Sequence, residues 1–357
     1  NTLDSITVSD CTLDPVFNSA TTEYNCTVKN NVTSVNVNAT ATSTKAKVRG
    51  LGAKDLVEGK NTLPIRVIAE DGSEKIYNIN ITRKAGASLL KNEIMKNTVI
   101  TASPTLTTSS NNTSDVSGLY KSTDTNTGKP TYYFRGNVEN NYVSFAGFTW
   151  RIVRINEDGT IRIVMQDGIN SNAKYEFNSN YNYTYMYYTN NSNAKTQLES
   201  WYQTNIGSKN DLASSVATGD YYCEQAKVKL IDDYTSGNAT MTTYKKYTPD
   251  FKCSSDGNGK GVVNASVGLL SYDEVVYAGG YVGLDNNYYL NNPAIYWWTM
   301  SPAGFVASRS SVWGGTAPGY IHSNYVFNTY SARAVLNLTA DTLATGNGTS
   351  SDPFVIS

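Results

Sequence analysis

One histidine limits the catalytic chemistry available to this chain. His322 is the only histidine among its 357 residues. A Ser-His-Asp triad or a histidine-rich metal site would have to use it, and no recognisable motif surrounds it. We therefore expect His322 to be a surface loop residue and not a catalytic base.

The four cysteines form two pairs along the sequence, Cys11 with Cys26 and Cys223 with Cys253. Neither pair has the C-x-x-C spacing of zinc and redox sites. Four cysteines allow three pairings, and joining neighbours keeps each bridge inside one predicted domain. We predict the disulfides Cys11–Cys26 and Cys223–Cys253, and hence an oxidising, extracellular location. The alternative is four unpaired buried thiols in a cytosolic protein.

Two adjacent carboxylate pairs could in principle support acid–base catalysis. Asp232 and Asp233 lie in a polar stretch. Asp273 and Glu274 follow Ser271 in the pattern S-x-x-E, a capping box in which negative charge favours the first helical turn. We expect both pairs to be solvated and structural, and we predict no catalytic residue.

The composition excludes several classes of partner. Charged residues make up 17% of the chain and the net charge is −1, so the basic surface of a nucleic-acid or anionic-membrane binder is missing. No apolar run has the length of a transmembrane helix. We expect any export and anchoring segments to lie outside this sequence. Tyr occurs 27 times against 9 Phe, a bias that fits β-rich extracellular proteins.

Residues 1–84 have the pattern of short β-strands. Apolar and polar residues alternate in SITVS, SVNVNATA and YNINIT, and Asp71-Gly72 precedes the last of these runs as a hairpin turn signal. The strings LDSITVSDCTLDPVFNSATTEYNCTV and VIAEDGSEKIYNINITR resemble the cadherin-like β-sandwich repeat of bacterial surface proteins. That resemblance implies a spacer, so we assign the domain no ligand.

Residues 85–130 change in character. LLKNEIMKN is compatible with a short helix, and TASPTLTTSSNNTSDVSG after it is rich in Ser, Thr and Asn. Such composition is typical of a linker. We therefore expect a short helix and a linker here.

Residues 131–357 predict an α+β domain. Hairpins around FTWRIVRI come first, Ala194, Leu198, Trp201 and Tyr202 have helical spacing, and the capping box at Ser271 begins another helix. The chain then returns to strands in YWWTMS, SSVWGG, SARAVLNL and DPFVIS.

The order of these motifs resembles an uncharacterised module of Gram-positive surface and phage-associated proteins. The motifs are NYVSFAGFTWRIVRINEDGTIRIV, LESWYQTNI, VGLLSYDEVVYAGG, YWWTMSPAGF and GTSSDPFVI. More distantly, the order resembles the C-type-lectin-like fold, which formylglycine-generating enzymes share. The predicted fold is thus mainly β with an α+β part: a small β-sandwich followed by a C-type-lectin-like domain.

That resemblance also separates the chain from its enzymatic and calcium-binding members. A formylglycine-generating enzyme needs a reactive cysteine pair late in its sequence, and no cysteine follows Cys253. Sugar-binding C-type lectins combine an E-P-N or Q-P-D loop with a later W-N-D. Asn291-Asn292-Pro293 is present here but W-N-D is not. We predict no metal, no cofactor and no enzymatic activity.

Tryptophans and tyrosines are the remaining candidates for a binding surface. We expect Trp150 and Trp201 to be core residues. Trp297 and Trp298 are adjacent on one predicted strand and must point to opposite faces, so we expect one to be exposed. The tyrosine-rich run 181–188 is a second candidate surface, or a strand that packs alternate rings.

The region 302–331 mixes Tyr, Trp, Arg and Asn with Gly and Ser, as recognition surfaces do. The C-type-lectin-like resemblance places a ligand surface in this late region, and the alternative is a loop region without a partner. The residues that we expect to bind ligand are Trp298, Arg309, Trp313, Tyr320, Asn324, Tyr325, Asn328 and Tyr330.

Together these features predict a non-enzymatic bacterial surface protein, an adhesin or receptor-binding module that recognises a glycan or a protein. The alternative is a structural subunit that self-associates into a fibre or layer.

Overall fold

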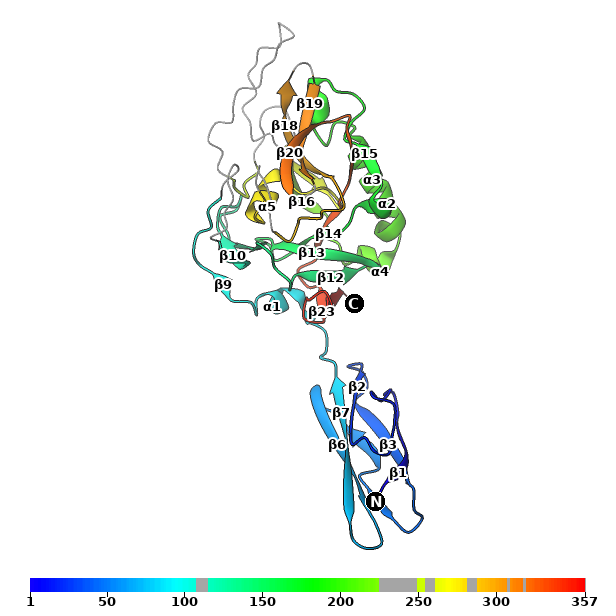
Figure 1. The fold of residues 1–357 in the computed structure, drawn as a ribbon. Helices are drawn as coiled ribbons and strands as arrows, with labels where there is room; N and C mark the ends of the chain where they lie inside the picture. The colour runs from blue at the N-terminus through cyan, green and yellow to red at the C-terminus, as the bar shows by residue number, and fades with distance from the viewer. Residues whose placement is uncertain are drawn as a thin grey trace. The chain divides into compact units, whose positions relative to one another are not determined.

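The computed structural model describes residues 1–106, 115–224, 249–253, 261–280, 288–306, 309–316 and 319–356. The chain forms two compact units, Asn1–Ala87 and Ser88–Ser357. Most of its regular structure is β-strand, as the sequence predicts (Figure 1).

The first unit is a β-sandwich of two sheets (Figure 1, blue to cyan). The three-stranded sheet has the order β1-β3-β5 and the four-stranded sheet the order β2-β7-β6-β4. Its strands are β1 (Leu3–Val8), β2 (Glu23–Val28), β3 (Ser34–Ala41), β4 (Lys47–Arg49), β5 (Gly52–Asp55), β6 (Gly59–Ile68) and β7 (Glu74–Arg83).

Alternation along these strands builds the core between the two sheets. Val37 from one sheet and Ile65 and Ile79 from the other are fully buried in one cluster. The predicted hairpin at Asp71-Gly72 joins β6 to β7 in antiparallel register, with Gly72 at a positive φ of 82°. The sandwich expected from the alternation is therefore confirmed.

The predicted Cys11–Cys26 disulfide is present in this unit. Cys11 follows β1 of one sheet and Cys26 lies on β2 of the other. The bridge therefore cross-links the two layers of a core that is small for independent stability.

The second unit contains the remaining strands and the helices. Its strands are β8 (Ser88–Leu89), β9 (Val99–Ile100), β10 (Gly118–Ser122), β11 (Thr131–Arg135), β12 (Tyr142–Phe145), β13 (Phe148–Ile155), β14 (Ile161–Met165), β15 (Lys174–Glu176), β16 (Gly219–Glu224), β17 (Gly261–Ala265), β18 (Trp297–Val306), β19 (Arg309–Thr316), β20 (Tyr320–Tyr325), β21 (Thr329–Ser331), β22 (Val335–Leu338), β23 (Leu343–Thr345) and β24 (Phe354–Ile356). Its helices are α1 (Leu90–Ile94), α2 (Ile169–Asn172), η1 (Tyr183–Met186), α3 (Asn193–Tyr202), η2 (Gln203–Gly207), α4 (Asn210–Ala213) and α5 (Tyr272–Tyr277).

The largest sheet brings the two ends of this unit together. Its order is β8-β23-β24-β12-β13-β11-β10-β9, and β14 and β22 extend it beside β13. The last strand, β24, pairs in parallel with β12, and β23 pairs with β8. A second sheet has the order β15-β21-β18-β19-β20, and β16 pairs with β17.

The segment expected to be a linker belongs in part to this sheet, which corrects the 85–130 boundary. The short helix is present as α1, and its Leu90 and Ile94 are fully buried in the core of the second unit. β8, β9 and β10 are strands of the largest sheet. Their pairing partners are as distant as β23, so composition alone gave no sign of them.

The two predicted helices form where their spacing and caps place them. Ser192 caps α3 by accepting from the backbone amide of Lys195, and Ser271 and Glu274 form the capping box of α5. Trp150 and Trp201 are core residues, as predicted. In the described part of the chain, no helix has the length and apolarity needed to cross a membrane.

We predict that each unit folds when expressed alone, as residues 1–87 or 88–357, because each has its own buried core. Thermal unfolding of each fragment should reproduce one transition of the full chain. A fragment that is unfolded under non-reducing conditions would contradict this expectation.

Trp150→Ala should destabilise the second unit by about 3–5 kcal/mol through the cavity that it leaves. Trp150 is fully buried, its ring centroid lies 6.1 Å from that of Trp201, and its Nε1 donates to the Phe145 carbonyl over 3.0 Å. Denaturant unfolding measures the loss. The control is Tyr181→Ala, whose side chain is 50% exposed and whose removal should cost about 0.5 kcal/mol or less.

Candidate functional site: an aromatic patch and a polar cleft

Part of the predicted surface does assemble on the second unit. Arg309 at the start of β19 lies over the rings of Tyr325 and Phe327, with its guanidinium carbon 5.5 and 5.8 Å from their centroids. The two rings are stacked at 5.4 Å, and Tyr181 meets Phe327 edge-on at 6.2 Å. Arg309 is exposed and the three rings are half-buried or exposed. We call Tyr181, Arg309, Tyr325 and Phe327 the aromatic patch.

Backbone pairing fixes the position of this patch. β19 and β20 are antiparallel, with Ser311 opposite Tyr325. The amide of Ser310 donates to the Tyr181 carbonyl over 2.8 Å, and the amide of Val326 donates to the Ser310 carbonyl over 3.1 Å. Backbone hydrogen bonds therefore join the segments around Tyr181, Ser310 and Val326. These bonds fix the backbone that carries the rings.

A second row of rings runs from the surface into the core. Tyr296, 40% exposed, stacks on Tyr330 at 5.4 Å, and Tyr330 packs against Trp298 at 4.6 Å. The Tyr330 hydroxyl donates to Asn324 Oδ1 over 2.6 Å. Two of the predicted residues, Asn324 and Tyr330, are thus bonded to each other and remain partly accessible.

The tryptophans do not belong to the surface, which corrects the expected exposure. Trp298 and Trp313 are 0% and 2% exposed. Trp313 stacks on Tyr272 of α5 at 4.5 Å. Trp297 is also buried, beneath the Arg333 guanidinium. Trp297 and Trp298 point to opposite faces of β18, as predicted, but other residues cover both faces. Region 302–331 is largely strand and not loop.

The remaining predicted residues, Tyr320 and Asn328, are not among the four residues of the aromatic patch. Tyr320 begins β20, and Asn328 donates its amide to the Tyr325 carbonyl over 2.9 Å in the turn that follows. His322 is exposed, but on strand β20. In the 181–188 run, Tyr187 and Tyr188 are buried after η1, so this run is not the strand considered above.

Phe327 is the patch residue that the sequence reasoning missed. The only signal in the sequence was its position two residues after Tyr325, and Phe327 itself lies in the turn that follows β20. Tyr181 belonged to the tyrosine-rich run, but its approach to Phe327 depends on tertiary contacts.

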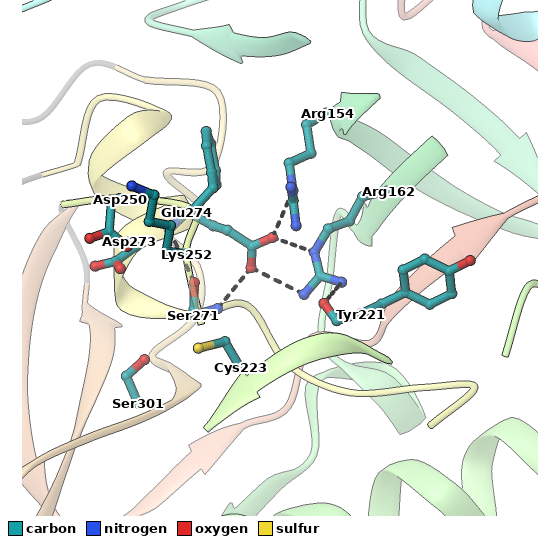
Figure 2. Close-up of a pocket in the computed structure, with 11 residues that line it drawn as sticks. Arg154, Arg162, Tyr221, Cys223, Asp250, Lys252, Ser271, Asp273, Glu274 and Ser301 are labelled. Atoms are coloured by element: carbon teal, nitrogen blue, oxygen red, sulfur yellow. Dashed lines mark hydrogen bonds and ion pairs between the residues drawn. The ribbon is translucent and has the colours of Figure 1, made fainter. Parts of the chain in front are cut away.

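A buried ion cluster lies elsewhere in this unit, beneath α5 (Figure 2). Glu274 Oε1 pairs with Nε of Arg162 and, at 3.4 Å, with Nε of Arg154. Glu274 Oε2 accepts from Arg162 Nη2 at 3.1 Å and from the Ser271 amide at 2.9 Å. Burial lowers the pKa of Arg154, Arg162 lowers it further, and Glu274 raises it. The carboxylate therefore neutralises charge between two guanidinium groups.

This cluster corrects the expected solvation of Asp273 and Glu274, which are 4% and 3% exposed. The helix cap is present as predicted, but β13 and β14 cover it with Arg154 and Arg162. Asp232 and Asp233 lie outside the described residues.

A polar cleft adjoins the cluster. Its volume is about 270 Å³, and Arg154, Tyr221, Cys223 and Phe251 line both the cleft and the small pocket at Glu274. Cys253, the disulfide partner of Cys223, lines the cleft. The predicted second disulfide is thus confirmed. The remaining cleft residues are Asn126, Thr127, Asn156, Glu157, Asp158, Gly219, Asp220 and Tyr222.

Phe251 connects the disulfide to the core. Its ring stacks on Tyr277 at 3.9 Å and the Arg154 guanidinium lies 4.8 Å from its centroid. Its amide donates to the Asp124 carbonyl over 3.0 Å. The bridge therefore holds Phe251, which is two residues from Cys253, against both β16 and the core.

Comparison with known proteins identifies the first unit. Residues 3–84 match the model of the cadherin-like beta sandwich domain. The predicted resemblance of the first unit to a cadherin-like β-sandwich domain is therefore confirmed. No curated protein and no solved structure matches the chain. Within the described ranges, no group of three or more His, Cys, Asp or Glu side chains is placed to hold a metal ion.

Glu274→Gln should destabilise the second unit by about 3–5 kcal/mol, because it leaves two buried guanidinium groups without their shared anion. Gln can still serve in a capping box, so the loss reports on the charge. Denaturant unfolding measures it.

Glu157→Gln is the matched control, since Glu157 lies 3.8 Å from Arg154 and is 21% exposed. This control should cost about 1 kcal/mol or less. Equal losses of stability for the two variants would show that the buried cluster contributes no more than the partly exposed ion pair of Glu157.

Proposed function

We propose that this chain is a non-enzymatic, extracellular binding module of a bacterial surface protein. In this proposal the second unit recognises a glycan or protein ligand through the aromatic patch, and the cadherin-like domain is its spacer. The observation that carries the proposal is an exposed arginine stacked on rigid, partly exposed rings.

The patch has the physical properties of a recognition surface. Its rings expose apolar area at little conformational cost, because the β19–β20 pairing already fixes their backbone. Arg309 adds directional donors that remain available above the rings, and Asn324 adds an amide close by. Interfaces concentrate their binding energy in such aromatic and arginine residues.

The extracellular location is supported by the two disulfides, which persist in oxidising compartments. We further propose a C-type-lectin-like arrangement for the second unit. It is supported by the element order, in which α3 and α5 precede β18 to β20, and β19 and β20 carry Arg309 and Tyr325 of the patch. The late position of the patch agrees with the ligand surface that this resemblance implies.

The ligand test is a screen of the full chain against glycan and host-protein arrays, followed by dissociation constants for the hits. Arg309→Ala, Tyr325→Ala and Phe327→Ala should each weaken binding by about 1–3 kcal/mol. They should leave the melting temperature nearly unchanged, because these side chains are exposed or half-buried.

Trp313→Ala is the opposite control, since this buried ring should cost about 3–5 kcal/mol of stability. Patch variants that lose as much stability as Trp313→Ala would show that the patch is packed structure. Retention of every array hit by all three patch variants would place the binding surface elsewhere. Formation of ordered polymers by the chain in the absence of ligand would favour the alternative function, a structural subunit of a fibre.

A further inference from the structure

The polar cleft beside the ion cluster shares no residue with the aromatic patch and has its own chemistry. It lies between the turn after β13, strand β16 and the disulfide-held Phe251. Its volume of about 270 Å³ is slightly below the roughly 300–1,000 Å³ of pockets that enclose drug-sized ligands. It therefore suits one small ring or one residue of a longer ligand.

Asn156 lies in the wall of this cleft as a buried, hydrogen-bonded side chain. Its side chain is 5% exposed, and its Nδ2 donates to Thr160 Oγ1 over 2.8 Å and to Asn337 Oδ1 over 3.0 Å. Its Oδ1 has no hydrogen-bond partner among the described residues. Less than 1 Å² of this oxygen is accessible, so Asn156 shapes the polar wall and is not itself a ligand contact.

The charges around the cleft favour a cation. Three carboxylates line it, those of Glu157, Asp158 and Asp220, against one guanidinium, that of Arg154. Arg154 is paired with Glu274 at 3.4 Å and with Glu157 at 3.8 Å. Burial raises the pKa of Asp158, but hydrogen bonds from Thr160 and Tyr221 outweigh it and hold this pKa below its usual value. Asp158 is therefore ionised at neutral pH, and the rim is net negative.

The other walls match a hydroxylated ring. The Tyr221 ring lines the cleft, and its hydroxyl is held by Asp158 Oδ2 at 2.9 Å. Asn126 and Thr127 add polar side chains at the rim. A sugar ring presents both C–H faces for an aromatic wall and hydroxyls for polar side chains. Within the described ranges the three carboxylates do not form a metal-binding group.

We propose that this cleft binds a single amino-sugar residue. Its ammonium group lies near the carboxylates of Glu157 and Asp220, and its ring lies against Tyr221. The proposal is independent of the aromatic patch, because the two sites have no side chain in common.

The test is a ligand-observed NMR titration of the full, oxidised chain with glucosamine, glucose, N-acetylglucosamine and cadaverine. Glucosamine should bind more tightly than glucose or N-acetylglucosamine by roughly threefold to tenfold, because only it adds an ammonium group to the ring. This preference should shrink as ionic strength rises from about 0.1 M to about 1 M, since the rim charges are exposed.

The double variant Glu157→Gln/Asp220→Asn should remove the preference while lowering the melting temperature only slightly, since Glu157 also pairs with Arg154. The matched control is Asp211→Asn/Asp341→Asn, which removes two exposed carboxylates that do not line the cleft. It should keep the preference. Arg309→Ala should also keep it, which separates this site from the patch.

Three results would overturn the proposal. The first is binding of none of the sugars. The second is equal affinity for glucosamine and glucose in the unmodified chain. The third is binding of cadaverine as tightly as glucosamine, which would show that charge alone is recognised and not the ring.

Discussion

The shared ion pair of Glu274 with Arg154 and Arg162 is the interaction on which the second unit most depends. Glu274 lies on the first turn of α5, whereas the arginines lie on β13 and β14. Three buried charges are favourable only in mutually compensating positions, so helix and sheet can dock in one arrangement. Arg154 also lines the polar cleft, so the same contact that orders the core sets the shape of a candidate ligand site.

Local patterns in the sequence predicted the features that depend on neighbouring residues. Period-two alternation and the Asp71-Gly72 turn were sufficient for the β-sandwich of the first unit, whereas its cadherin-like character was inferred from a family resemblance. The S-x-x-E pattern at Ser271 was sufficient for the α5 cap. The pairing of nearby cysteines was correct because each bridge lies within one unit. In all three cases the interacting residues are close in sequence or share one folding unit.

Features that depend on distant residues were not predictable in this way. Glu274 was expected to be solvated because the arginines that bury it are far away in sequence, Arg162 by 112 residues. Trp297 and Trp298 were assigned to opposite faces correctly, but the covering of the second face is a tertiary property. β8 is two residues long and pairs with a strand distant in sequence, β23, so no local pattern marked it as a strand. Which side chains are buried was therefore harder to predict from the sequence than the secondary structure.

The pairing of β24 with β12 has a consequence for the order of folding events during the export that we propose. β12 receives its parallel neighbour from residues 354–356, about two hundred positions later in the chain. Until those residues are available, β12 is an open sheet edge that can pair with another chain. Vectorial secretion from the N-terminus would let the cadherin-like domain fold first and would delay closure of the second unit until its C-terminal strand emerges. Nascent chains stalled before β24 should therefore be the species most prone to aggregation and most in need of a holdase.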